Sequence, residues 1–342
     1  MRKIVLVILV CVSWLGATPY TDMLGRVADV TSTSRLVFLG PGALRLGVYL
    51  GLENRLVGIE KIEKGASPLS PYRTFLGQER ISKLPIVGTG GPGKMPDLEA
   101  LLVLKPDLII TSFVDQNMID LIVSKTGIPV VSLSYGETYG GNAQKLQSVK
   151  NSLLFLGKLT QTLSRAEILV SFMNQQEKKL ADLKVSPQKI YVGGLGYKGM
   201  QGITSTEAAY PPFELLGLKN CIFEGKETIG HQFIDFEALI KVNPEIIFID
   251  MFSKAKIKEE YEAKQELFNT MSAYQKGNVK EVLGYNFYST NIENLFVIAW
   301  QIALEMGVHV DIENEAKLIY EAFYPEKGAE LLRQLPYGFS AL

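Results

Sequence analysis

The feature of this sequence that most constrains its fold is a segment that occurs twice. Residues 96–110 read PDLEALLVLKPDLII and residues 234–248 read IDFEALIKVNPEIIF, so Asp, Glu, Ala, Leu, Pro and Ile coincide. In each copy an acidic residue opens a short amphipathic helix, and the helix ends before a proline. An apolar strand without alternation follows, which is typical of parallel strands covered by helices on both faces.

A second repeat lies upstream of the first. RLVFLGPG at 35–42 and KIYVGGLG at 189–196 each contain a charged residue, a strand and a glycine-rich turn. Between the two halves, residues 143–183 contain no proline and only one glycine, Gly157. Their apolar residues recur at helical spacing, so we expect one long helix there.

These repeats predict an α/β protein of two lobes joined by a single long α-helix. A chain of 342 residues exceeds the roughly 250 residues at which one hydrophobic core stops growing. We expect an N-terminal lobe (N-lobe) over 18–141, the connecting helix within 142–187 and a C-terminal lobe (C-lobe) over 188–342. Ligands bind beyond the carboxyl ends of parallel strands, so two facing lobes would form a ligand cleft.

The N-terminus, MRKIVLVILVCVSWLGA, has the layout of a signal peptide, with two basic residues, an apolar run and a cleavage point near Ala17. A membrane anchor would need about 18 to 20 apolar residues, which is longer than this run. Cys11 is preceded by Val10, a poor fit to lipid attachment. We therefore expect export to the periplasm, with residues 1–17 removed and Cys221 left as the single cysteine, buried as a small apolar residue.

Composition and motifs narrow the possible functions. The formal net charge is -1 and no long block of one sign occurs, so nucleic acid is not an expected partner. The segment GPGALRLG lacks the dinucleotide spacing GxGxxG, and no GxxxxGK[ST] loop occurs. An exported chelatase or hydrolase and a structural surface protein remain the alternatives to a binding protein.

Five segments in order resemble the class III periplasmic binding proteins, which serve importers of ferric siderophores, haem, cobalamin and some metal complexes. They are YTDMLGRVADV (20–30), an opening β-hairpin signature, RLVFLGPGALRLGVYLGLENRLVGIE (35–60), LEALLVLKPDLIITS (98–112), GGLGYKGMQGITST (193–206) and GYNFYSTNIENLF (284–296). The resemblance covers nearly all of the mature chain. It implies two Rossmann-like lobes joined by one long helix, and an ABC importer permease with its cytoplasmic ATPase as the partner.

The histidine count bears on the ligand. A bare transition metal usually takes three or four N, O or S ligands, whereas the chain contains only His231 and His309. A metal already held by a small chelator fits better, and a ferric siderophore or similar iron complex is our first expectation. Haem, cobalamin and a nickel chelate fit as well. No cofactor is expected, and His231 is a possible metal ligand.

Candidate ligand contacts in the N-lobe follow the predicted strands. The turn containing Gly42 opens a helix, so its backbone N–H groups could bind an anionic chelate. Arg45 in the first helical turn could pair with a ligand carboxylate, or it could be a solvated arginine. Thr89 and Tyr135 follow the third and fifth strands, and the resemblance makes the loop of Tyr72 a wall of the cleft.

Candidate contacts in the C-lobe lie in loops that follow strands or precede helices. Tyr197 and Lys198 occupy the turn GLGYKG, and an ordinary solvated loop is the alternative. A lone histidine such as His231 is more often structural, and His309 is read as structural. The remaining candidates precede the last long helix: Asn286 and Tyr288.

Glu99 and Glu237 occupy equivalent positions of the repeated segment, each two residues after an aspartate. A carboxylate at a helix start is stabilised by the helix dipole, which explains their positions without any partner. The resemblance supplies another role, because one glutamate on each lobe of such proteins meets arginines of the permease. We expect a monomer that docks through these two residues.

Overall fold

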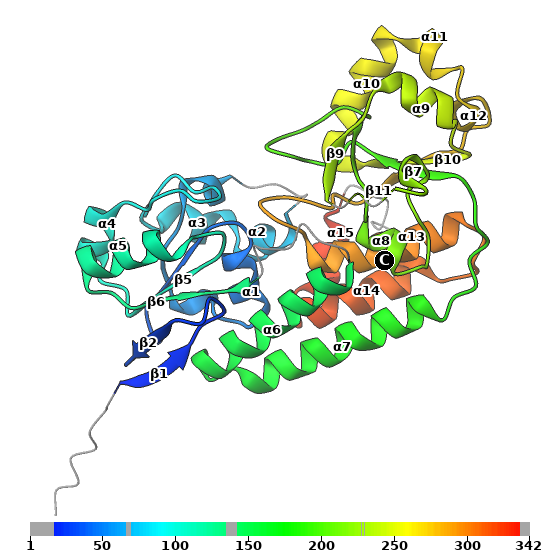
Figure 1. Cartoon of the computed structure of the whole chain (residues 1–342). Coiled ribbons are helices and arrows are strands. Elements are labelled where there is room, and N and C mark those ends of the chain that lie inside the picture. Colours follow the sequence, from blue (N-terminus) through cyan, green and yellow to red (C-terminus); the bar gives the residue numbers. More distant parts are fainter. Residues whose placement is uncertain (1–16, 66–69, 135–141, 227, 229, 336–342) are drawn as a thin grey trace, which may run out of the picture.

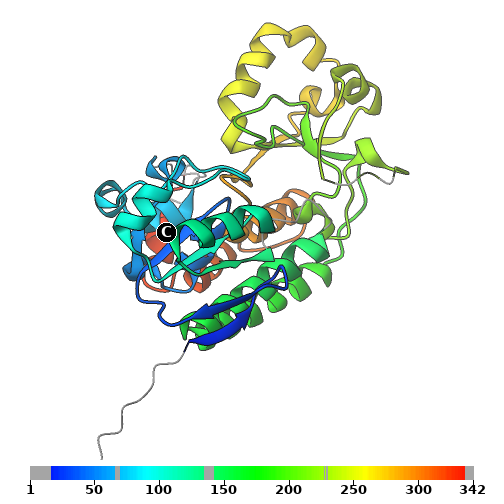
Figure 2. The same cartoon turned by 60° about the vertical axis from the view of Figure 1, so that its left-hand side comes forward.

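The computed structural model describes residues 17–65, 70–134, 142–226, 228 and 230–335. Two parallel β-sheets lie in separate lobes, and a layer of long helices runs beneath both (Figures 1 and 2). The two-lobed α/β fold predicted from the repeats is therefore confirmed. Short 3₁₀ turns add to the elements given below: Glu53–Arg55, Lys61–Lys64, Cys221–Phe223 and Met251–Ser253.

The N-lobe is built on a four-stranded parallel sheet of order β4-β3-β5-β6. Leu36 and Phe38 of its central strand belong to one apolar cluster, and Val37 and Leu39 belong to another, so both faces are covered as the apolar runs predict. Its elements are β3 (Leu36–Leu39), α1 (Ala43–Tyr49), β4 (Leu56–Gly58), α2 (Pro71–Leu76), α3 (Gln78–Lys83), α4 (Leu98–Leu104), β5 (Leu108–Thr111), α5 (Gln116–Thr126) and β6 (Val130–Ser132).

The C-lobe is built on a three-stranded parallel sheet of order β11-β10-β7, beside a two-stranded antiparallel sheet of β8 and β9. Its elements up to the last strand are β7 (Ile190–Gly193), β8 (Ser205–Glu207), α8 (Pro211–Glu214), β9 (His231–Phe233), α9 (Phe236–Val242), β10 (Ile246–Asp250), α10 (Lys254–Ala263), α11 (Gln265–Phe268), α12 (Ser272–Gln275) and β11 (Val279–Val282). The chain then ends in α13 (Ile292–Glu305), α14 (Ile312–Phe323) and α15 (Gly328–Arg333).

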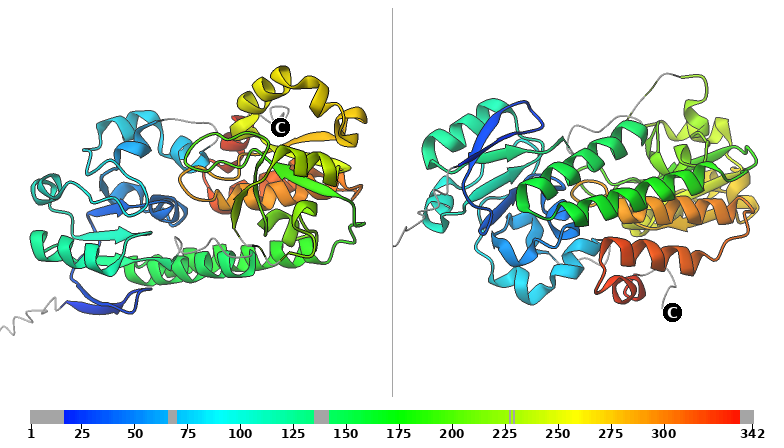
Figure 3. Two further views of the ribbon diagram at one scale, coloured as in Figure 1. Left: turned by 45° about the horizontal axis from the view of Figure 1, so that its top comes forward. Right: turned by 90° about the horizontal axis from the view of Figure 1, so that it is seen from below.

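The connection between the lobes differs from the prediction, since two helices replace the single long one. α6 (Asn142–Thr160) and α7 (Leu163–Ala181) lie side by side (Figure 3), and Gln161 between them has a φ of 61°. Gly157 permits the close packing, because a Cβ at that position would lie 2.7 Å from the Cβ of Ala166. The polar run Thr160 to Thr162 was the missed signal for this turn.

One hydrophobic core serves both lobes. The inner faces of the two sheets pack on the helical layer, and a single cluster of buried apolar side chains includes Phe38 of β3, Leu153 of α6 and Phe248 of β10. Arg165 of α7 adds polar ties, donating to the carbonyl oxygen of Tyr49 at 3.0 Å and of Ala322 at 2.6 Å. Movement of one lobe against the other therefore has to deform shared packing.

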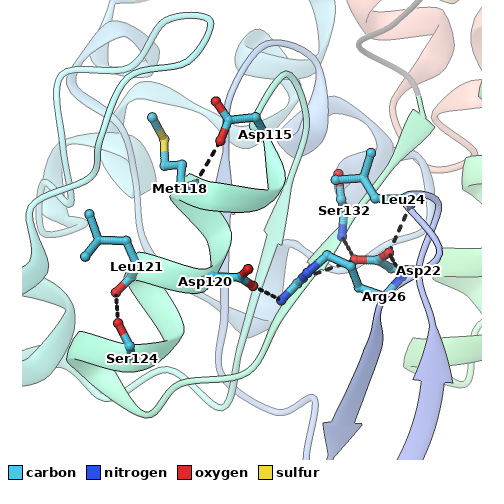
Figure 4. Close-up of polar contacts among 9 residues, drawn as sticks. All are labelled: Asp22, Leu24, Arg26, Asp115, Met118, Asp120, Leu121, Ser124 and Ser132. Carbon is cyan, nitrogen blue, oxygen red and sulfur yellow. Dashed lines mark hydrogen bonds and ion pairs between the residues drawn. The ribbon is translucent and has the colours of Figure 1, made fainter.

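The opening β-hairpin expected at 20–30 is present as β1 (Thr18–Thr21) and β2 (Val27–Val30). Buried Asp22 accepts a hydrogen bond from the backbone N–H of Ser132 at 3.1 Å (Figure 4). Arg26 pairs with both Asp22 and Asp120 of α5. These contacts attach the hairpin to the N-lobe.

A buried arginine joins the two lobes. Arg45 of α1 is fully buried, and its guanidinium donates to the carbonyl oxygen of Phe287 at 2.6 Å and to Oδ1 of Asn291 at 3.0 Å. Both acceptors belong to the loop between β11 and α13, which extends toward the N-lobe in Figure 1. The guanidinium carbon also lies 4.6 Å from the ring centroid of Tyr72.

A second tie lies at the tip of the same loop. The Tyr288 hydroxyl donates to Glu60 Oε2 at 2.8 Å and accepts from the Gly91 N–H at 2.7 Å. The same Glu60 oxygen accepts from the Gly40 N–H at 3.0 Å. Burial raises the pKa of Glu60 to about 7 and outweighs these two hydrogen bonds, which lower it, while the nearby Glu63 raises it further.

Replacing Glu60 with glutamine should reduce the pH dependence of stability. The pKa of Glu60 is about 7 in the folded protein against an ordinary value of 4.5, so the folded state binds the proton more tightly. Its stabilisation is complete below pH 4.5 and is lost as the pH rises through about 7. In the wild type, this group should make the free energy of unfolding about 2 kcal/mol larger at pH 5 than at pH 8. Thermal melts at the two pH values should show that Glu60→Gln removes this part of the difference.

The glutamine oxygen can accept both hydrogen bonds that now converge on Oε2, so the geometry should survive the substitution. Glu79→Gln is the matched control, because Glu79 is exposed and lies on the surface helix α3. An unchanged pH dependence in Glu60→Gln would contradict the assignment.

Candidate functional site

The candidate site lies where strand-end loops of the two sheets meet. On the N-lobe side these are the turn after β3, Glu60 after β4 and the loop 88–93. On the C-lobe side they are the loops 194–202 after β7 and 283–291 after β11. The contact of Tyr288 with Glu60 and Gly91 shows that the two sets of loops are adjacent.

Backbone strain is concentrated at this edge. Within the described ranges, seven residues other than glycine have a positive φ, and four of them lie in strand-end loops: Phe113, Lys198, Tyr288 and Ser289. Two others, Lys105 and Asn243, end the repeated helices before a proline. Strained backbone of this kind persists where the surrounding structure holds a side chain in a required direction.

The protein itself uses part of the predicted anion cradle around Gly42. Gly42 is buried with a φ of 83°, and it precedes the first residue of α1. The neighbouring Gly40 N–H already donates to Glu60, and Pro41 has no N–H to offer. The Glu60 carboxylate thus takes up one of the backbone donors of this turn, the Gly40 N–H. Glycine is required at Gly40, because a Cβ there would collide with the Ser112 carbonyl oxygen.

Arg45 and Tyr72 lie together inside the protein instead of on an open cleft wall. Both side chains are fully buried. The Tyr72 hydroxyl donates to Glu63 at 2.6 Å, and Glu63 also lies 3.6 Å from Arg73. Arg45 joins the two lobes through the loop 283–291, and a solvated arginine at position 45 is wrong because that loop covers it.

Two other predicted contacts, Thr89 and Asn286, lie in the strand-end loops of the candidate site, and a third, Tyr135, is not described. Thr89 is exposed, and its carbonyl oxygen accepts from the Ile62 N–H at 3.1 Å. Asn286 is half-buried, and its Oδ1 accepts from the Thr290 hydroxyl at 3.0 Å. Tyr135 lies outside the described residues.

Two of the predicted C-lobe residues, Tyr197 and His231, lie against Phe233 in one aromatic group, which we call the aromatic platform. The rings of Tyr197 and His231 are stacked, with centroids 4.2 Å apart and planes at 9°. Phe233 meets both rings edge-on and is 58% exposed, so the platform reaches solvent. Lys198 is exposed, and its amine lies 5.5 Å from the Tyr197 ring centroid.

Hydrogen bonding fixes the tautomer of His231. The Ser205 hydroxyl donates its proton to the carbonyl oxygen of Leu195 at 2.6 Å. Its oxygen is 2.7 Å from His231 Nε2 and must therefore accept from that nitrogen. Nδ1 then carries the lone pair. Burial lowers the pKa of His231 below its ordinary value, which favours the neutral ring, and a neutral imidazole can ligate a metal.

Several residues that position these loops were missed from the sequence. Asp250 at the end of β10 is fully buried and accepts from the N–H groups of Phe252 and Tyr285 at 2.8 and 2.9 Å. Burial raises its pKa to about 7. Gln201 donates from Nε2 to the Tyr197 carbonyl oxygen at 2.6 Å. An acidic residue at or just beyond the end of a buried strand was the available signal for Asp250 and for Glu60.

Glu99 and Glu237 are exposed in the first turns of α4 and α9, as the repeat predicts. The side chain of Asp97 caps α4 by accepting from the Ala100 N–H at 2.9 Å. Cys221 is half-buried, and burial raises the pKa of its thiol to about 12. The expectation of a buried cysteine is therefore met only in part.

The described residues also bear on metal binding and on membrane insertion. The described part of the chain contains no group of three or more His, Cys, Asp or Glu side chains that could hold a metal ion. None of the helices in that part combines the length and apolar character needed to cross a membrane.

Three solved structures illustrate proteins with the same fold. MolA of Haemophilus influenzae, a molybdate-binding protein, has a TM-score of 0.69 at 18% identity, and the match covers 90% of this chain and 98% of the MolA chain. CeuE of Helicobacter pylori with Ni(II) bound has a TM-score of 0.64 at 18% identity, with 93% and 99% covered. HutB of Vibrio cholerae, a haem-binding protein, has a TM-score of 0.59 at 19% identity, with 81% and 100% covered.

At these identities the likeness establishes the fold. Among curated proteins, none matches the chain. The profile of a family described as "Periplasmic binding protein" matches residues 37–283, which is well over half of the sequence. This family supplies solute-binding components of ABC importers, which carry out no catalysis. The chain therefore belongs to the periplasmic binding protein family.

Proposed function

We propose that this protein captures a chelated metal ion, with a ferric siderophore or similar iron complex as the first candidate, and delivers it to the permease of an ABC importer. The observation that carries the proposal is the aromatic platform, in which His231 is stacked on Tyr197 with the lone pair of Nδ1 unprotonated. Planar aromatic surfaces suit the rings of organic chelators.

The ligand set favours a chelate over a bare ion. One histidine nitrogen can fill one coordination position, and the described residues offer no cluster that could fill the others. The chelator would supply the remaining donors. A bare oxyanion fits less well, because the Gly40 N–H that could bind it is occupied by Glu60.

The charges around the platform favour an anionic complex. Lys198 is exposed and its amine lies beside the Tyr197 ring, so it can meet a negatively charged chelator that binds at the platform. Ferric ions bound by catecholate or carboxylate groups form such complexes. Haem, cobalamin and a nickel chelate remain the alternative ligands, and the likeness to HutB and to CeuE with Ni(II) supports testing them.

The cellular setting is part of the proposal. The N-terminal layout of residues 1–17 supports export with cleavage near Ala17, although residues 1–16 lie outside the described structure. A monomer would present Glu99 and Glu237 on different lobes to the two halves of a permease. The lobe boundaries near 141 and 188 belong to the same proposal.

Alanine at His231 should weaken binding of a metal complex by about thirtyfold, since truncating an anchor in a binding site commonly costs about 2 kcal/mol. The purified mature protein would be titrated with a ferric catecholate, a ferric hydroxamate, Ni(II)-histidine and haemin, followed by quenching of intrinsic fluorescence. His309→Ala is the control, because His309 is exposed next to α13. Equal affinities of the two variants for every complex would rule out the platform as the metal site.

Changing Glu99 and Glu237 together to alanine should reduce uptake at least tenfold while ligand affinity and Tm stay near wild type. Exposed charges govern encounter and orientation more than folding. Uptake of the radiolabelled complex identified in the titration would be measured in cells that carry the importer. Glu167→Ala with Glu259→Ala removes the same charge from other exposed helical positions. Normal uptake by the first pair would refute the docking role.

A further inference from the structure

Helix α4, which carries the proposed docking residue Glu99, exposes a large apolar side chain beside that glutamate. Val103 of α4 is 84% exposed, the highest value among the large apolar residues of the described chain, and Leu102 is 46% exposed. These residues follow Glu99 by four and three positions, so all three share one helical face. Any partner that approaches the Glu99 carboxylate also covers Val103.

The fold itself does not require these apolar groups. α4 attaches to the N-lobe through Leu101, which is fully buried, with Leu98 and Leu104 packed against the same cluster. Val103 makes no comparable contribution because it is almost fully exposed. As a β-branched residue it is also a poorer helix former than lysine or glutamate.

The repeated helix of the C-lobe differs at these two positions. The repeat aligns Leu102 with Ile240 and Val103 with Lys241. Ile240 is half-buried and packs against the C-lobe cluster, whereas Lys241 is exposed one turn beyond Glu237. The two helices therefore present the same carboxylate, with an apolar surface beside it on one lobe and a positive charge beside it on the other.

We propose that the N-lobe helix α4 is the stronger permease-docking surface, because Val103 and Leu102 fill an apolar depression of the permease next to the cation that pairs with Glu99. α9 docks through charge alone. The positive charge of Lys241 offsets part of the attraction between Glu237 and a cation of the permease. This inference rests on the proposed importer function. It identifies the partner surface for α4 as a cation bordered by apolar side chains, and the surface for α9 as purely polar.

The asymmetry has a consequence for orientation. A permease built of two different halves would bind this protein in one orientation, since only one half would match α4. A permease of two identical halves would bind either way round, with most of the docking free energy coming from whichever half holds α4. In both cases loss of the valine should matter more than loss of the lysine.

The test compares Val103→Ser with Lys241→Ser in binding of the full mature protein to its cognate importer in lipid nanodiscs, without added ligand. Burial of a valine side chain corresponds to about a tenfold change in affinity, so Val103→Ser should bind about tenfold more weakly. Lys241→Ser should bind as well as wild type or more tightly. Val103→Leu, which keeps the apolar surface, should retain binding, and Tm should be unchanged in all three.

Equal effects of the serine variants, or no effect of Val103→Ser, would overturn the proposal. Glu99→Ala measured in the same assay separates the two levels of inference. If it weakens binding while Val103→Ser does not, docking stands and the apolar contact is wrong; if neither weakens binding, the docking role itself fails. A wild-type dimer in sedimentation velocity that Val103→Ser dissociates would instead assign this surface to self-association, which also overturns the proposal.

Discussion

The buried guanidinium of Arg45 is the interaction on which the arrangement of the two lobes depends. A charge removed from water is costly unless its hydrogen-bonding groups are satisfied and opposite charges lie near. Here the carbonyl oxygen of Phe287 and Oδ1 of Asn291 accept from it, and the Glu63 and Glu293 carboxylates contribute attraction. Because these partners come from both lobes, separating the lobes would break these hydrogen bonds and remove part of the charge attraction.

The shared core has the same consequence for motion. The cluster that joins Phe38 to Phe248 passes through α6, and α7 is bonded to both α1 and α14 through Arg165. Large closure of one lobe on the other would have to break this packing, so the site has to be largely formed before ligand arrives. The positive φ values of Lys198 and Tyr288 agree with loops that are held in advance.

The fold could be predicted from the sequence because its signals are local. A non-alternating apolar run such as 108–111, and an aspartate that opens a helix such as Asp97 or Asp235, can each be recognised from residues close by in the sequence. The structure contains both the strand and the helix starts. The break at Gln161 was missed because apolar residues recur at helical spacing on both sides of it, which leaves the short polar run 160–162 as its local signal. The role of Glu60 was missed because its partner Tyr288 lies 228 residues away in the sequence.

The two sides of the site differ in how their polar groups are used. On the N-lobe side, Gly40 and Gly91 donate to groups of the protein, and Glu60 accepts from two elements at once. On the C-lobe side, His231 is held by Ser205 through one nitrogen and keeps the lone pair of the other, and Lys198 is exposed. Under the proposed function, a ligand can therefore gain its contacts from the C-lobe without breaking the ties between the lobes. Binding then requires no rearrangement of the lobes that could reject other ligands. Selectivity would rest on the shape and charge of the chelator at the platform and on an open coordination position of the metal.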